Sequence, residues 1–327
     1  MSDTAAPPQA STEGPAPRPL PRRPAPRHRG RRKEATACAV LMAPFFVLLV
    51  GVFLAPVITA VWLSFFTDDR SGLGFGPEST TFVGLRSYAA VFGDPTFLGA
   101  LGVVLVFCLV YIPLLVLLSL TLALLLDSGA ARLRPLIQLG LFLPHTVPGI
   151  IAAIIWLYLY TPGISPVVDV LAGADVTIDL LGVETVIPSI VNIAIWTNLG
   201  YNMVIFYTAL RAVPRELVEA SVVDGAGPVR TALSVKAPLI RSSVVMVVLF
   251  SLIWTLQLFT EPMLLSQSTP VINSRFTPSM YIYDAAFTRN NYGLAAAASV
   301  ILLVCTVALS YVVTRWSNRD ARRRAAG

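Results

Sequence analysis

Long apolar runs separated by short polar segments dominate this chain. Each run is long enough to cross a bilayer hydrocarbon core of about 30 Å, which takes about 20 apolar residues in a helix. Hydrocarbon offers backbone groups no water to bond, so spanning runs must be helical. The pattern predicts an all-α, polytopic membrane protein with six transmembrane helices, near residues 37–66, 97–126, 136–160, 187–210, 241–260 and 291–314.

The charges in the connecting segments alternate in sign along the chain. The 67–96 and 161–186 segments are mainly acidic, whereas the 127–135 and 211–240 segments and the C-terminal tail are basic. Basic loops are enriched on the cytoplasmic side of a membrane. The alternation therefore predicts a multi-pass protein with both termini and residues 211–240 in the cytoplasm.

The two ends of the chain differ in composition from the membrane domain predicted over residues 36–314. Residues 1–35 are rich in Pro, Ala and Arg, and the pattern predicts a disordered basic cytoplasmic tail. Residues 315–327 form a second basic cytoplasmic tail. The first apolar run is roughly double the length of the hydrophobic region of a secretory signal peptide, which favours a membrane helix that is retained.

Composition supports the same class. Of the 327 residues, 55% are hydrophobic and 13% are charged, against about 25% charged in soluble domains. Mean hydropathy is +0.73. The formal net charge is +6, but the basic residues gather in the tails and the predicted cytoplasmic loops. The excess therefore indicates membrane orientation and contact with lipid, and we expect no nucleic-acid partner.

The chain shows no pattern for enzymatic or metal chemistry. Cys38, Cys108 and Cys305 lie in apolar runs, and His28 and His145 have no ligand spacing. There is no phosphate-binding GxxxxGK[ST] motif. We therefore predict a protein that is not an enzyme, with no catalytic residues, no metal site and no cofactor.

The polar segment at residues 211–240, here the 211–240 loop, is the most distinctive stretch. Pro214 suits the first turn of a helix, and Gly225 allows a sharp turn after it. Pro228 can open a second short helix, which Pro238 is expected to close. The loop is therefore predicted to be a compact cytoplasmic helix-turn-helix rather than an extended connector.

Polar side chains inside the later spans suggest a pathway for a neutral polyol. Aromatic faces stack on C–H surfaces while amides and hydroxyls bond to hydroxyl groups. In the fifth span the candidates share one helix face by their i, i+3, i+4, i+7 spacing. The alternative is that they only bond neighbouring helices. The candidates are Asn198 in the fourth span and Ser251, Trp254, Thr255 and Leu258 in the fifth.

No Asp, Glu, Lys or Arg is expected in the interior of a span. Such residues commonly mark proton relays or ion-coupling sites, so their absence disfavours a proton-driven pump. Glu261 and Asp284 lie near the outer end of the fifth span and in the segment after it. We expect both to be solvated charges at the rim.

The 211–240 loop resembles the conserved loop of permease subunits of bacterial ABC importers. The resemblance rests on the runs Glu219-Ala220-Ser221, Asp224-Gly225-Ala226 and Ala237-Pro238 at their present spacing. Three positions depart from the commonest form of that pattern: Ser221, Ala232 and Ala237. We expect these departures to weaken packing of the second helix.

Other segments are similar to the carbohydrate branch of those permeases. They resemble the first permease of maltose-type and glycerol-phosphate-type importers over most of residues 40–314. The matching runs are Pro44–Phe66, Phe82–Leu101, Leu143–Trp156 and Tyr292–Leu303.

The resemblance implies a function in the bacterial plasma (inner) membrane. Its implied partners are a second homologous permease subunit, a cytoplasmic ATPase dimer and an extracytoplasmic solute-binding protein. The chain would move a sugar or related polyol by alternating access, energised by the separate ATPase subunits. The residues implied to couple to the ATPase are Glu219, Ala220, Ser221, Asp224, Gly225 and Ala226.

Two other classes remain as alternatives. A self-contained secondary transporter of a small neutral solute would show an internal repeat and charged coupling residues inside its spans, and the sequence shows neither. A membrane scaffold or sensor would have no transport role. It would tolerate Gly225→Asp, whereas a permease would lose uptake and ATPase association.

Overall fold

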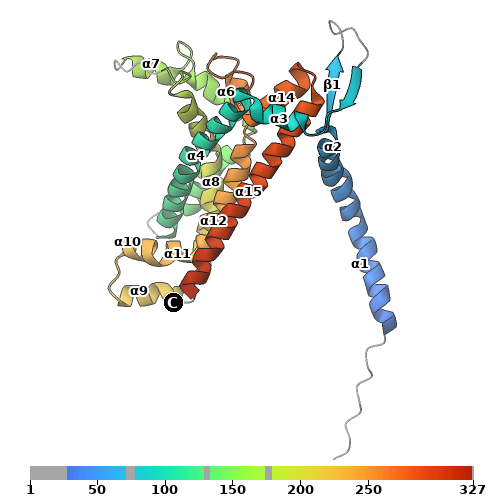
Figure 1. Cartoon of the computed structure of the whole chain (residues 1–327). Coiled ribbons are helices and arrows are strands. Elements are labelled where there is room, and N and C mark those ends of the chain that lie inside the picture. Colours follow the sequence, from blue (N-terminus) through green and yellow to red (C-terminus); the bar gives the residue numbers. More distant parts are fainter. Residues whose placement is uncertain (1–27, 71–77, 129–132, 174–178, 326–327) are drawn as a thin grey trace, which may run out of the picture. The chain divides into compact units, whose positions relative to one another are not determined.

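The computed structural model describes residues 28–70, 78–128, 133–173 and 179–325 (Figure 1). The chain divides into two compact units, Met1–Pro56 and Val57–Gly327, and each is described on its own. Helices dominate both, and the described ranges contain one sheet, a two-stranded hairpin. The prediction of an all-α membrane fold is confirmed.

The first unit contains α1 (His28–Leu48) and a π-helical turn, η1 (Leu49–Leu54). Helix α1 includes residues 28–35, which the sequence assigned to a disordered tail; residues 1–27 lie outside the described part. Apolar side chains such as Leu41 and Phe45 are exposed, at 80% and 62%. An apolar helix with this exposure is suited to lipid or to a partner helix.

The elements that follow the first predicted span include two strands and a short helix that the sequence did not predict. Helix α2 (Ala55–Leu63) leads into strands β1 (Phe66–Arg70) and β2 (Glu78–Phe82), which pair antiparallel. Helix α3 (Arg86–Gly93) follows, in a region predicted only as a connecting loop.

Helix α4 (Pro95–Asp127) starts at a well-formed cap. The Asp94 carboxylate accepts a hydrogen bond from the Thr96 backbone N–H at 2.8 Å. Pro95 stands in the first turn, where a missing N–H costs nothing.

The remaining elements are α5 (Arg134–Phe142), η2 (Leu143–Thr146), α6 (Gly149–Tyr160), α7 (Pro166–Gly173), α8 (Val186–Arg211), α9 (Arg215–Val223), α10 (Pro228–Thr231), η3 (Ala232–Lys236), α11 (Ala237–Leu239), α12 (Arg241–Leu256), α13 (Thr260–Leu265), α14 (Pro278–Tyr283), η4 (Asp284–Thr288) and α15 (Tyr292–Ala325).

The candidate spans fall where the apolar runs predicted them. In the described ranges five helical stretches have suitable length and hydropathy: Thr36–Leu63, Pro95–Asp127, Val186–Arg211, Arg241–Leu265 and Tyr292–Ser317. The sixth is a pair, α5 with η2 and then α6, bent by 96°. The count of six is reached when this pair is one broken span.

The bend in the third predicted span has a local cause. Val147 and Pro148 are both extended, with ψ of 126° and 136°. Proline disfavours helical geometry in the preceding residue and has no N–H to continue the helix. The apolar run therefore predicted the span but not its change of direction.

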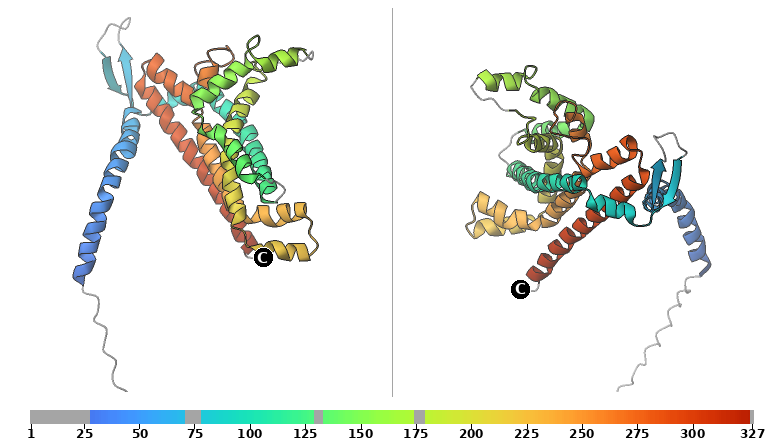
Figure 2. Two further views of the ribbon diagram at one scale, coloured as in Figure 1. Left: turned by 180° about the vertical axis from the view of Figure 1, so that it is seen from behind. Right: turned by 45° about the horizontal axis from the view of Figure 1, so that its top comes forward.

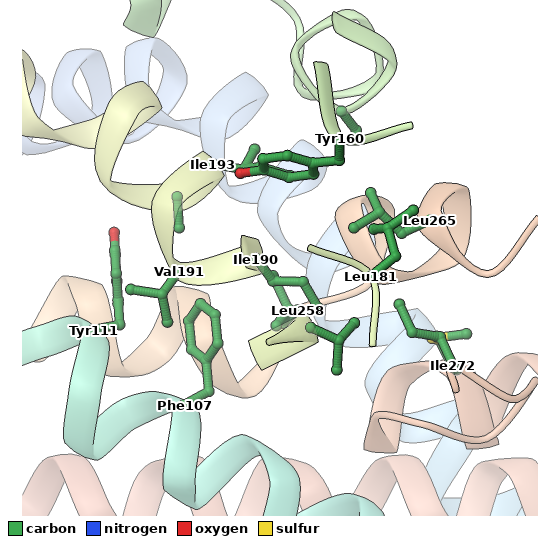
Figure 3. Close-up of a cluster of buried hydrophobic side chains, with 14 of the residues drawn as sticks. Phe107, Tyr111, Tyr160, Leu181, Ile190, Val191, Ile193, Leu258, Leu265 and Ile272 are labelled. Carbon is green, nitrogen blue, oxygen red and sulfur yellow. The ribbon is translucent and has the colours of Figure 1, made fainter. Parts of the chain in front are cut away.

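The core forms where α4, α8 and the segments after α12 meet. Figure 3 shows Phe107 and Tyr111 of α4 beside Val191 of α8, with Leu258 and Leu265 in the same cluster. A second cluster joins the other ends of α4 and α8, around Ala123, Met203 and Phe206. These contacts fix α4 against α8 along most of their length.

Gly200 of α8 allows a very close approach to α5. A Cβ atom at this position would lie 1.8 Å from the Leu141 carbonyl oxygen, closer than any side chain tolerates. We expect Gly200→Ala to separate α5 from α8 and to lower the free energy of unfolding by about 1–3 kcal/mol, as overpacking does. Thermal unfolding in detergent measures the loss.

Gly102→Ala is the matched control, since a Cβ there would meet nothing within 4 Å. Inside helix α4 it should leave stability unchanged or raise it slightly, because Ala is the better helix former. Equal melting temperatures for the two variants would contradict the close approach.

Candidate functional site

The 211–240 loop is a helix-turn-helix. Figures 1 and 2 show α9 and the α10–α11 segment side by side, joined by a tight turn. Pro214 is the residue before α9, and Pro228 opens α10 as predicted. The prediction that Pro238 ends the second helix is wrong, because α11 continues to Leu239. The wider π-helical turn η3 ends at Lys236, two residues before this proline, and accommodates it.

The turn after α9 is a Schellman motif. Gly225 has φ of +78°. Its N–H donates to the Val222 carbonyl at 3.0 Å, and the Ala226 N–H donates to the Ser221 carbonyl at 2.9 Å. This pair of bonds satisfies the last carbonyls of the helix and requires a left-handed residue, for which glycine is best suited.

A hydroxyl pair joins the two helices of the loop. Ser221 Oγ lies 3.2 Å from Thr231 Oγ1, and also donates to the Val218 carbonyl at 2.7 Å. Thr231 is buried, at 5% exposed. Ser221 is one of the departures expected to weaken packing of the second helix; its hydroxyl instead contacts that helix.

The surface of the loop combines carboxylates with exposed apolar side chains. Of the residues implied to couple, Glu219, Ala220, Asp224 and Gly225 are exposed, and Ser221 and Ala226 are half-buried. Contiguous exposed apolar side chains commonly mark a protein contact. The exposed large apolar side chains on the loop are Leu217, Val222, Val223, Val229, Leu233 and Leu239.

An ion pair ties the loop to the end of α4. Lys236 Nζ lies 2.6 Å from Asp127 Oδ2, and the two side chains are 19% and 10% exposed. Beside this pair is a cavity of about 290 Å³, also lined by Arg211, Arg215 and Glu219. The loop is therefore fastened to a spanning helix distant in sequence.

The predicted pathway residues lie mostly inside the packed helices. Ser251, Thr255 and Leu258 are 6%, 0% and 3% exposed. Thr255 Oγ1 donates to the Ser251 carbonyl at 2.7 Å. Asn198 donates to a carbonyl of its own helix, and Trp254 is half-buried. Their role in a solute pathway stays a prediction.

Tyr111 lies close to two of the predicted pathway residues, Trp254 and Asn198, and was not predicted from the sequence. Its ring lies 5.5 Å from that of Trp254, centroid to centroid. Its hydroxyl also lies close to the Asn198 side chain. A tyrosine inside an apolar run was the available signal, but its helix face could not be assigned without the packing.

The expectation that Glu261 and Asp284 are solvated rim charges is wrong. Their exposed fractions are 8% and 6%. Asp284 is paired with Arg289 at 2.8 Å and lies 3.9 Å from Arg275. Glu261 lies within the fifth candidate span, Arg241–Leu265, because the helix resumes as α13 beyond the end of α12. The expected absence of charge inside the spans is therefore also wrong.

A chain of polar contacts lies outside the spans, around Asp94 and Tyr281. The Tyr281 hydroxyl donates to Asp94 Oδ2 at 2.8 Å, and the Arg289 guanidinium lies 5.0 Å from the Tyr281 ring centroid. Burial works to raise the pKa of Asp94, but hydrogen bonds from Thr96 and Tyr281 outweigh it and lower that pKa. Burial and the bond to Asp94 raise the pKa of Tyr281 to about 12.

Known proteins resemble this chain over most of its length. Residues 116–323 match the family described as the binding-protein-dependent transport system inner membrane component. The chain is 30% identical to the diacetylchitobiose uptake system permease protein NgcF of Streptomyces coelicolor, over 94% of this chain and 93% of that protein. It is 29% identical to the sn-glycerol-3-phosphate transport system permease protein UgpA of Pectobacterium atrosepticum, over 86% and 93%.

The fold also matches a solved structure. The crystal structure of a bacterial ABC transporter involved in the import of the acidic polysaccharide alginate gives a TM-score of 0.75 at 20% identity, covering 89% of this chain and 98% of that one. At this identity the likeness concerns the fold alone.

We predict that breaking the Lys236–Asp127 pair loosens the loop. Asp127→Lys or Lys236→Asp alone should increase the fraction of molecules in which the loop is detached from α4 roughly tenfold. The reason is that a charged hydrogen bond contributes about 1.5 kcal/mol. Limited trypsin cleavage in the loop, at exposed Arg215 and Arg230, measures the opening.

The double exchange, Asp127→Lys with Lys236→Asp, should restore protection because it re-forms the pair. Glu216→Lys, at an exposed position, controls for the change of charge. Unchanged cleavage in both single variants would contradict the role given to the ion pair.

Proposed function

This chain belongs to the family of binding-protein-dependent transport system inner membrane components, and we propose that it is the permease subunit of an ATP-driven importer of a sugar or related polyol. The names of its relatives support the cargo class, since one is a diacetylchitobiose permease and another a glycerol-3-phosphate permease. The match agrees with the resemblance read from the 211–240 loop and with transport rather than catalysis.

The single observation that carries the proposal is the loop surface. Six large apolar side chains are exposed on a short, internally bonded helix-turn-helix, and the sequence contains no phosphate-binding loop of its own. We infer that the loop docks on a separate cytoplasmic ATPase. Glu219 and Asp224 would offer carboxylates to cationic groups of that partner, and Gly225 would leave its surface unobstructed.

Motion of the docked loop would reach the spans by two routes. One is the Lys236–Asp127 pair, which leads to α4. The other is the backbone, since α10, η3 and α11 continue to Leu239 and α12 begins at Arg241. Alternating access needs such coupling between a nucleotide-driven subunit and helices that have two arrangements.

The proposed assembly contains a second homologous permease, an ATPase dimer and an extracytoplasmic solute-binding protein. One structural relative was solved with an alginate pentasaccharide-bound periplasmic protein, which supports a binding-protein partner. The alternating loop charges support a topology with both termini in the cytoplasm. The pathway would include Asn198 and Trp254, which converge on Tyr111.

One observation favours the secondary-transporter alternative: Glu261 is buried inside a span, where coupling carboxylates of such transporters are found. The two functions are separated by reconstitution. An importer subunit moves no solute in vesicles that contain this polypeptide alone, whereas a secondary transporter does so under an ion gradient.

We predict that Gly225→Asp abolishes ATP-dependent uptake and co-purification of the ATPase while membrane insertion is retained. The aspartate would strain the left-handed turn and place a side chain on the docking surface. Uptake in whole cells and recovery of the ATPase from solubilised membranes measure the two effects.

Gly163→Asp is the matched control. Gly163 has nearly the same φ, +77°, and a Cβ there would meet nothing within 4 Å, but it lies far from the loop in sequence. It should carry the same backbone strain without loss of the ATPase. Retained uptake and ATPase association in Gly225→Asp would instead support the scaffold class.

A further inference from the structure

Glu261 occupies an unusual position in the described spans. It is the one Asp, Glu, Lys or Arg there that lies more than three residues from a span end. Its side chain is 8% exposed. An ionisable residue in such a place is costly and is found where it binds a substrate, an ion or a partner charge.

The carboxylate has no cation beside it in the described part of the chain. No ion pair there includes Glu261. A Cβ at Gly149, the first residue of α6, would lie 3.8 Å from Glu261 Oε1. The carboxylate therefore approaches the helix that begins at the bend of the third span.

The carboxylate interacts with Tyr111, which belongs to a core cluster that also includes the rings of Trp156 and Trp254. Tyr111 interacts electrostatically with Glu261, and its hydroxyl lies close to the Asn198 side chain. Trp254 packs against the Tyr111 ring. Further along α6, the buried indole N–H of Trp156 has no acceptor. Ring faces, an amide, a hydroxyl and an unpaired N–H donor are groups that bind saccharides.

We propose that Glu261 accepts hydrogen bonds from solute hydroxyl groups and that it restricts transport to uncharged saccharides. The inference rests on the proposed importer function and specifies its cargo. An unpaired carboxylate in a low-dielectric interior repels a phosphate or uronate. No Lys or Arg lies more than three residues inside a described span, where it could neutralise such an anion.

The first test uses the assembled transporter with its own partner permease, ATPase and binding protein in proteoliposomes. ATP hydrolysis and uptake are measured with uncharged disaccharides, including diacetylchitobiose, and with glycerol 3-phosphate and an alginate oligosaccharide. We expect at least one of the uncharged disaccharides to be transported, and glycerol 3-phosphate and the alginate oligosaccharide not to be transported. Uptake of an acidic probe overturns the inference but leaves the importer function intact. Absence of ATP-dependent uptake for every probe contradicts the importer function and the inference together.

The second test isolates the permease from the binding protein, which is kept the same throughout. Glu261→Gln removes the charge at nearly constant volume. It should raise KM for the uncharged saccharide about 10- to 100-fold, the effect of one lost charge-assisted hydrogen bond, with the maximal rate reduced less. Glu261→Asp keeps the charge but withdraws it by one methylene and should give an intermediate KM.

Glu184→Gln makes the same chemical change at an exposed position outside the spans and should leave KM unchanged. An unchanged KM in Glu261→Gln overturns the inference. So does a loss of assembled complex in that variant, which would assign Glu261 to a contact with the second permease.

Discussion

The demand of hydrocarbon that every backbone amide be bonded within the protein governs this structure. It makes each apolar run a helix and confines irregular backbone to places where other groups can satisfy it. The break at Val147 and Pro148 lies against α8, whose Gly200 meets the carbonyl of Leu141. The turn at Gly225, which has a positive φ, lies in the polar 211–240 loop, where a Schellman pair of hydrogen bonds satisfies the helix end.

The same constraint places the groups suited to a protein partner and the groups suited to a solute in different parts of the molecule. Groups that can bond a partner in water lie on the 211–240 loop, with Asp224 and Val223 exposed at its turn. Groups that can bond a solute lie among the spans, around Tyr111. The Lys236–Asp127 pair connects these regions through α4, the helix that carries both Tyr111 and Asp127.

Much of the fold could be predicted because its signals are local. Apolar run length gave the spans, and the chemistry of Gly225 and Pro228 gave the turn and the second helix of the loop. Features that depend on contacts between distant residues could not be predicted. The burial of Glu261 depends on where α13 meets α6, and the Ser221–Thr231 contact depends on how two short helices pack. The 96° bend could not be predicted because it depends on how the two halves of the third apolar run pack against the other helices.

The length of α4 has a mechanical consequence. Its 33 residues make a rod about 50 Å long, and even at a tilt of about 40° it rises about 38 Å along the bilayer normal. The hydrocarbon core is about 30 Å thick, so one or both ends protrude through the headgroup layer. In the proposed importer, a protruding end at Asp127 would let a cytoplasmic ATPase exert force on α4 from the water phase, outside the hydrocarbon core.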